Sequence, residues 1–170
     1  MKNTFSALAA VLSTVNAGII PFVGCPKYKE DFQTVENLDI DRYGGKWFEV
    51  QKDWQSPFQW LSSCVTADYS IKDASQKMVG VKNRGFFPWI FFQYSGVEGQ
   101  AKCRPEEGRC YVNFEEGADM NVEPNYHVVD VDYDSYAIVY TCRPWLGFLG
   151  KQEELWVLSR TNTISDAKLT

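Results

Sequence analysis

The sequence contains little of what catalysis or nucleic-acid binding requires. It has a single histidine, His127, and it lacks a Gly-x-Ser-x-Gly motif, a Cys-x-x-Cys motif and a glycine-rich phosphate loop. These absences argue against a hydrolase triad and a zinc site, so we expect no catalytic residue, no metal and no cofactor. Acidic residues outnumber basic ones by 22 to 17, which argues against binding to nucleic acid.

Long hydrophobic runs are also scarce, and the apolar stretch within residues 1–17 is too short to span a bilayer. It follows Lys2 and ends with small residues up to Ala17, a pattern typical of a secretory signal peptide. No repeat or linker divides the rest, and its length suits one hydrophobic core. We therefore expect a secreted, extracellular protein with a signal peptide at residues 1–17 and one domain at 18–170.

The remainder of the chain consists of short alternating or aromatic-rich runs separated by turn residues, which is typical of antiparallel strands. Pro88 interrupts the most hydrophobic segment, 86–92, and excludes a continuous central strand there. Eight strands close an up-and-down barrel that is wide enough for one small ligand. The eight predicted strands are 46–53, 64–72, 77–86, 91–103, 109–116, 125–132, 135–143 and 153–160.

Three short segments carry a distinctive pattern. Residues 43–50 contain a Gly-x-Trp element, residues 130–142 contain an Asp-Tyr-x-x-Tyr element, and residues 154–160 end in an arginine. In this order and spacing they resemble the three signature regions of the lipocalins, and the mature chain is similar to the apolipoprotein D and bilin-binding group. The resemblance implies an all-β, eight-stranded antiparallel barrel that carries a small hydrophobic molecule. The matching residues are Gly45, Trp47, Asp132, Tyr133, Tyr136 and Arg160.

The resemblance also implies how one end of the barrel is closed. In the family, the Trp of the first segment stacks against the Arg of the third, so Trp47 and Arg160, together with Gly45, are the expected closure. A cation over an indole contributes roughly 0.5–2 kcal/mol. The family has a C-terminal helix that packs on the barrel. Because the chain stops at Thr170, where such a helix would begin, we expect the helix to be truncated.

Five cysteines in an exported chain predict disulfides and leave one thiol over. The resemblance implies a bridge between Cys25 and Cys142 that would staple the N-terminal arm to the barrel. Cys103 and Cys110 flank a turn-rich segment, where they would bridge a hairpin. Cys64 matches a family cysteine whose partner lies in a C-terminal tail, so it is either free or paired with a segment that this chain lacks.

Cys25 has a second interpretation, which the sequence leaves open. Residues 22–25 have the form of a bacterial lipoprotein box, and acylation of Cys25 would anchor the protein to a membrane. Pro21 lies within this region, and the apolar run of the leader is separated from it. We therefore favour the disulfide over the lipid anchor.

Aromatic residues, 15% of the chain, predict the character of the ligand. Rigid rings with a few polar tips suit a retinoid, fatty acid, sterol, bilin or carotenoid. Period-two alternation places Trp156 on the same face as Arg160, which is the interior if Arg160 reaches Trp47. With the cavity positions implied by the resemblance, the expected ligand-binding residues are Tyr69, Tyr126, His127 (a Trp in the family) and Trp156, and those of the portal are Trp54, Phe58 and Trp60.

Two other functions compete with a carrier. The apolar loops 54–61 and 144–150 are typical of an interaction surface, so the chain is alternatively a module that contacts a protein receptor, a membrane or a lipoprotein surface while its own side chains fill the barrel. The second alternative is a lipid isomerase of the prostaglandin D synthase type that uses Cys64 as a cavity thiolate. No cationic neighbour in the sequence activates Cys64, so we do not expect an enzyme.

Overall fold

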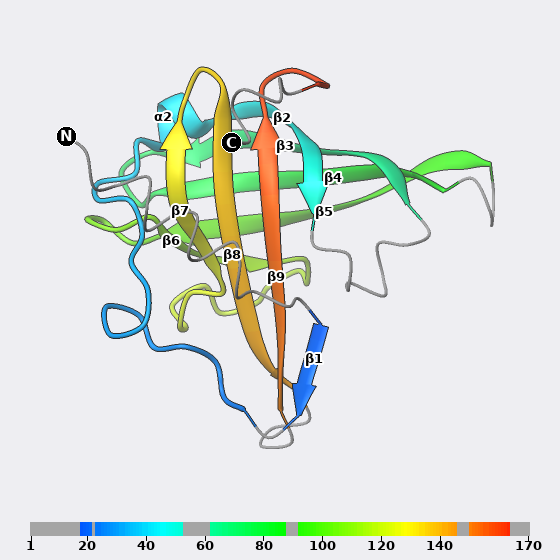
Figure 1. Cartoon of the computed structure of the whole chain (residues 1–170). Helices are drawn as coiled ribbons and strands as arrows, with labels where there is room; N and C mark the ends of the chain where they lie inside the picture. Colours follow the sequence, from blue (N-terminus) through cyan, green and yellow to red (C-terminus); the bar gives the residue numbers. More distant parts are fainter. Residues whose placement is uncertain (1–17, 22, 53–61, 88–91, 146–149, 164–170) are drawn as a thin grey trace, which may run out of the picture.

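The computed structural model describes residues 18–21, 23–52, 62–87, 92–145 and 150–163 (Figure 1). Strands dominate this part of the chain, which contains one short helix, α2 (Ile40–Tyr43), and no helix long and apolar enough to cross a membrane. The strands are β1 (Gly18–Pro21), β2 (Gly45–Lys52), β3 (Ser63–Asp73), β4 (Met78–Phe87), β5 (Gln93–Cys103), β6 (Arg109–Asn113), β7 (Tyr126–Asp132), β8 (Tyr136–Trp145) and β9 (Gly150–Ser159).

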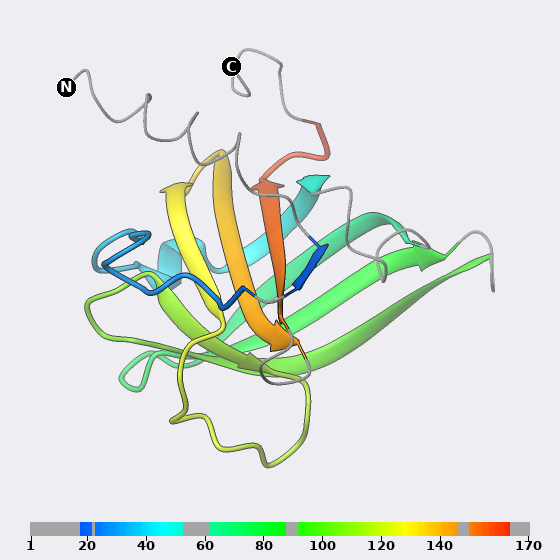
Figure 2. The same ribbon diagram turned by 60° about the horizontal axis from the view of Figure 1, so that its bottom comes forward.

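Eight of these strands, β2 to β9, close into one antiparallel barrel. Each pairs with the next along the chain, and β9 pairs with both β8 and β2, which completes the closure. The predicted eight-stranded barrel is confirmed, with strand ends within a few residues of those expected. The sequence did not predict β1, which pairs with residues 150–153 of β9, beyond the reach of β2. Figure 2 shows how strongly the sheet curls round on itself.

Alternation along β7, β8 and β9 separates two hydrophobic clusters, one inside the barrel and one outside. The inner cluster forms the main core and includes Trp47 and Val128, both without exposed surface. The outer cluster is smaller and lies on the convex face of these strands. Its members are Ile138, Tyr140 and Leu155, with Phe32, Val129, Tyr136 and Cys142 packed against them.

The N-terminal arm, residues 23–39, packs Phe32 on the outer cluster, whereas its Val35 and Leu38 belong to the inner one. The ring of Phe32 packs edge-on against His127 and Tyr140, with centroids 5.1 and 5.2 Å apart. The disulfide expected between Cys25 and Cys142 is formed, and it ties the arm to β8. Because it joins residues 117 positions apart, the chain-entropy model assigns it about 5 kcal/mol of stabilisation.

The seam between β6 and β7 is the shortest pairing in the barrel wall, with two residue pairs. The side-chain amide of Asn125 extends it, because this amide accepts from the Val112 N–H at 2.8 Å and donates to the Val112 carbonyl at 2.9 Å. In this way a side chain takes the place of a strand backbone. The second expected disulfide, Cys103–Cys110, is also formed and links β6 to β5 on the other side.

Candidate functional site in the barrel cavity

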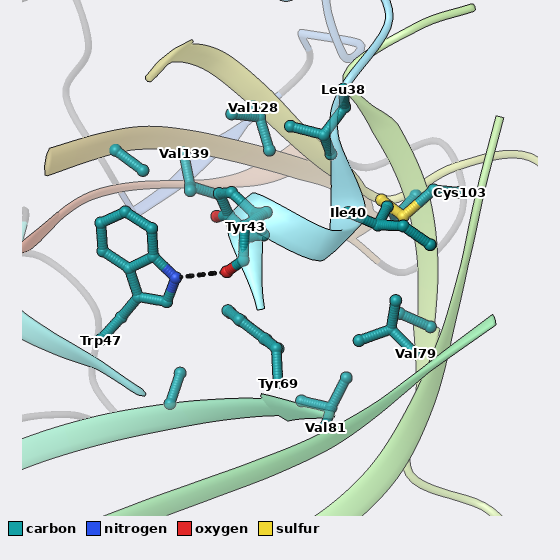
Figure 3. Packing of buried hydrophobic residues seen from close by; sticks show 14 of the residues in the cluster. Leu38, Ile40, Tyr43, Trp47, Tyr69, Val79, Val81, Cys103, Val128 and Val139 are labelled. Carbon is teal, nitrogen blue, oxygen red and sulfur yellow. Dashed lines mark hydrogen bonds between the residues drawn. A yellow bond between two sulfur atoms is a disulfide. The ribbon is translucent and has the colours of Figure 1, made fainter. Parts of the chain in front are cut away.

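The closed end of the barrel is built around Trp47. Its side chain has no exposed surface, and its indole N–H donates to the carbonyl of Tyr43 at 2.8 Å (Figure 3). The helix α2 places that carbonyl across the barrel end, and Asp39 caps the helix by accepting from two backbone N–H groups. The Arg160 guanidinium lies 3.6 Å from the centre of the Trp47 ring, so the two residues expected from the motifs are in contact.

Arg160 also binds the backbone of the two segments that meet at this end. Its guanidinium donates to the carbonyls of Arg42, Gly44 and Lys46 at 2.6–3.0 Å, and its Nε donates to that of Tyr133 at 2.9 Å. Gly45 lies between these acceptors at φ +84°, a conformation that favours glycine. One side chain therefore joins the start of β2 to the turn between β7 and β8.

Three tyrosines are hydrogen-bonded together next to this closure, and two of them, Tyr69 and Tyr126, form the floor of the cavity. The hydroxyl of Tyr126 is the hub, lying 2.7 Å from that of Tyr43 and 3.0 Å from that of Tyr69. Tyr43 also stacks on Tyr69, with ring centroids 5.4 Å apart. Burial raises the pKa of Tyr69 to about 12 and raises those of Tyr43 and Tyr126 well above their ordinary value, so all three hydroxyls remain protonated at neutral pH.

A cavity of about 300 Å³ lies above this floor. It is lined from seven strands and the residues next to them, which places it inside the barrel. Three of the predicted ligand-binding residues, Tyr69, Tyr126 and Trp156, line it together. The other lining residues are Glu49, Val65, Ala67, Val81, Asn83, Val112, Phe114, Asn125, Thr141, Arg143, Gln152, Glu154 and Leu158.

The wall contains two carboxylates that the sequence analysis did not single out. Glu49 has a side chain only 9% exposed, and burial raises its pKa even though Lys52 lies 3.5 Å away. Glu154 lies close enough to raise the pKa of Glu49 further. The side-chain oxygen of Asn83, another lining residue, is buried and has no hydrogen-bond partner. At the rim, Arg143 donates to Gln152, which in turn donates to Glu154.

The prediction that His127 lines the cavity is wrong. Tyr126 faces inward, so the next residue on the same strand faces outward, and His127 packs under the N-terminal arm between Phe32 and Tyr140. The His127 ring is surrounded by aromatic rings, and the positive charge of Arg109 lies nearby. Burial and that positive charge lower its pKa to about 4, and its Nδ1 has no partner.

Cys64 is exposed and unpaired among the described residues, and it does not line the cavity. It lies in a separate groove along β2 to β5, which shares with the cavity only Glu49 and Val65. A cavity thiolate, which the isomerase alternative needs, is therefore missing at Cys64. The expected portal residues Trp54, Phe58 and Trp60 lie outside the described residues. Within the described part, no group of His, Cys, Asp and Glu side chains is arranged to hold a metal ion.

A closed antiparallel barrel with a Trp–Arg plug at one end and a cavity of about 300 Å³ inside defines a small-ligand-binding β-barrel. The sequence comparison makes the family explicit: a model of the lipocalin-like domain matches residues 38–170, and the chain belongs to this family. Apolipoprotein D of Cavia porcellus is 28% identical over 172 residues, which cover 97% of this chain and 81% of that protein. The Lazarillo protein of Schistocerca americana is 26% identical over 164 residues, covering 95% and 72%.

The fold is shared with solved structures. Insecticyanin from the tobacco hornworm Manduca sexta superposes with a TM-score of 0.69 at 21% identity, and the match covers 90% of this chain and 77% of insecticyanin. At that identity, the likeness supports the barrel architecture and not a particular ligand.

Proposed function

We propose that this protein binds and carries one small hydrophobic molecule in the cavity of its barrel. The observation that supports this most directly is the cavity itself, with about 300 Å³ of space above the tyrosine floor, lined by aliphatic and aromatic side chains together with several polar ones. Lipocalin relatives are carriers of this kind. Burial of an apolar ligand that loses ~300 Å² of exposed surface gains about 7–8 kcal/mol before ordering costs.

The residues proposed to contact the ligand are Tyr69, Tyr126 and Trp156. Trp156 is partly buried against the core and lines the cavity above Leu158, so its ring offers a broad apolar wall. Trp47, Arg160 and Gly45 are proposed to act by closing the barrel end. Retinoids, fatty acids, sterols, bilins and carotenoids remain the ligand classes to be compared.

We also propose that the protein acts outside the cell. The two disulfides are typical of proteins that mature in an oxidising compartment. The leader-like sequence of residues 1–17 supports the same assignment.

Quenching of tryptophan fluorescence tests the carrier proposal. The oxidised protein would be titrated with a retinoid, a fatty acid, a sterol, a bilin and a carotenoid, in parallel with the Trp156→Ala variant. We expect saturable one-to-one quenching by at least one class and about tenfold weaker binding by the variant. A folded protein that shows no saturable response to any of them would argue against a carrier and in favour of the interaction module.

A further inference from the structure

We propose that the ligand of this cavity is an amphiphilic organic cation, with an apolar body and an ammonium group that binds beside Trp156 between Glu49 and Glu154. This inference rests on the proposed carrier function. It goes further because it assigns a charge to the ligand, which the hydrophobic classes named above do not share.

The register of β9 places these groups in a row along one side of the cavity. Leu158, Trp156 and Glu154 follow one another on the inner face, each about 7 Å from the next along the strand. Glu49 on β2 pairs with Leu158, one step nearer the closed end than Trp156. The indole therefore lies between the two carboxylates along the strand, while the other strands contribute both apolar and amide side chains to the lining.

An unpaired polar atom in the lining of the same cavity points to a donor on the ligand. The Asn83 oxygen, on β4, lines the cavity and is buried without a partner, and a buried acceptor left unmet is unfavourable. An ammonium group donates hydrogen bonds and carries positive charge, so it suits this acceptor, the two carboxylates and the electron-rich face of an indole. A carboxylate ligand would meet repulsion from the same groups.

The positive side chains in this region already have partners. Lys52 contacts Glu49 but does not line the cavity, and Arg143 is an exposed residue whose Nε is directed to Gln152. The lining thus carries two negative charges and one positive charge at the rim. Without a ligand, burial disfavours the ionised form of Glu49 and raises its pKa. A bound cation would favour the ionised form and lower that pKa again.

A displacement experiment tests the charge preference. The neutral reporter N-phenyl-1-naphthylamine would be bound to the oxidised protein and displaced at pH 7.5 by decylamine, decanol or decanoate, which share a hydrocarbon chain and differ in charge. We expect decylamine to displace the reporter at about tenfold lower concentration than decanol, with decanoate the weakest.

Two variants locate the effect. Glu49→Gln keeps the shape of the side chain and should weaken decylamine about tenfold while decanol and the reporter change less than twofold. The matched control is Glu98→Gln, since the Glu98 side chain is 69% exposed, pairs with Lys82 and lies outside the cavity. We expect no change in any of the three affinities for this variant. Melting curves of both variants establish that they are folded.

The outcomes separate this inference from the carrier proposal. If the reporter binds, and Trp156→Ala weakens it, but decylamine binds no better than decanol, the cation assignment is overturned and the carrier stands. The same holds if Glu49→Gln leaves the preference for decylamine intact, or if Glu98→Gln reduces it equally. If no saturable binding of the reporter is found, both proposals are overturned.

Discussion

The closed end of the barrel and the cavity wall above it are formed by the same strands, but they differ in how completely their buried polar atoms are hydrogen-bonded. At the closed end, the Trp47 indole, the Arg160 guanidinium and the tyrosine hydroxyls all have partners within 3.0 Å. On the wall, the Asn83 oxygen has no partner and the carboxyl of Glu49 has a raised pKa. Paired polar groups support a fold, whereas buried groups without adequate partners oppose it.

This difference separates two roles that one strand can serve. Residues near the closed end are placed to hold the barrel together, while those on the wall keep hydrogen-bonding capacity that a ligand can use. Figure 3 shows the first role, with Trp47, Tyr43 and Tyr69 packed against one another at one end of the core. Substitutions in the two regions should therefore affect stability and binding in different proportions.

The largest expected effect is that of Trp47→Ala. Removal of a fully buried indole leaves a large void and removes the ring under Arg160, so we expect a loss of about 3–5 kcal/mol in the free energy of unfolding. Trp156→Ala should cost at least about 2 kcal/mol less, because Trp156 is only partly buried and faces the cavity. Urea denaturation of both variants measures the difference, and equal losses would contradict the division between the two regions.

Arg160→Lys should have the next largest effect. A lysine retains the charge but cannot reach all four carbonyls that the guanidinium contacts, and it stacks less well on an indole. We expect a loss of about 2–3 kcal/mol in stability. Reporter affinity should change less than twofold at a temperature where the variant is fully folded. A selective loss of affinity in a stable variant would show that the closed end also takes part in binding.

Tyr126→Phe tests the boundary between the two regions, because this residue belongs to both. Removal of its hydroxyl leaves the hydroxyls of Tyr43 and Tyr69 buried without their shared partner, at a cost of about 1–2 kcal/mol. The ring remains in place, so an apolar ligand should bind with nearly unchanged affinity. Thermal unfolding and reporter titration of the same sample measure both quantities, and a tenfold loss of affinity would place the hydroxyl in the binding site.

Much of the barrel follows from local pattern. Alternating runs bounded by turn residues predict its eight strands, because a strand with one face on the core must repeat every two residues. β1 has no such signal: it is four residues long, and its partner on β9 becomes available only when the barrel forms. The two hydrogen bonds between Asn125 and Val112 could not be predicted from the sequence either, since they depend on where β6 and β7 diverge in space.

The alternation of side chains along a strand explains why one cavity residue was predicted correctly and another wrongly. Trp156 lines it as predicted from the alternation along the last strand, whereas Tyr126 and His127 are consecutive and cannot both face inward on a regular strand. Alternation from Trp47 and Trp156 also places Glu49 and Glu154 inside. They were overlooked because charged residues on a strand are usually solvated, and the sequence alone gives no measure of how well the rest of the wall excludes water.

The smallest expected effect is that of Glu49→Gln, which should raise the free energy of unfolding, whereas the other substitutions lower it. Glu49 has a raised pKa in the folded protein, so the folded state binds its proton more tightly than the unfolded chain does, and stability is lost as the pH rises from the ordinary pKa of 4.5 through the raised one. Glu49→Gln removes this loss. Without ligand, the variant should be more stable than the parent at pH 7 by a fraction of a kcal/mol, and the advantage should shrink towards pH 4. Denaturation at several pH values measures it, with Glu98→Gln as the exposed control. A Glu49→Gln variant less stable than the parent at pH 7 would show that the ion pair with Lys52 outweighs the burial of the carboxylate, and that this wall supports the fold as the closed end does.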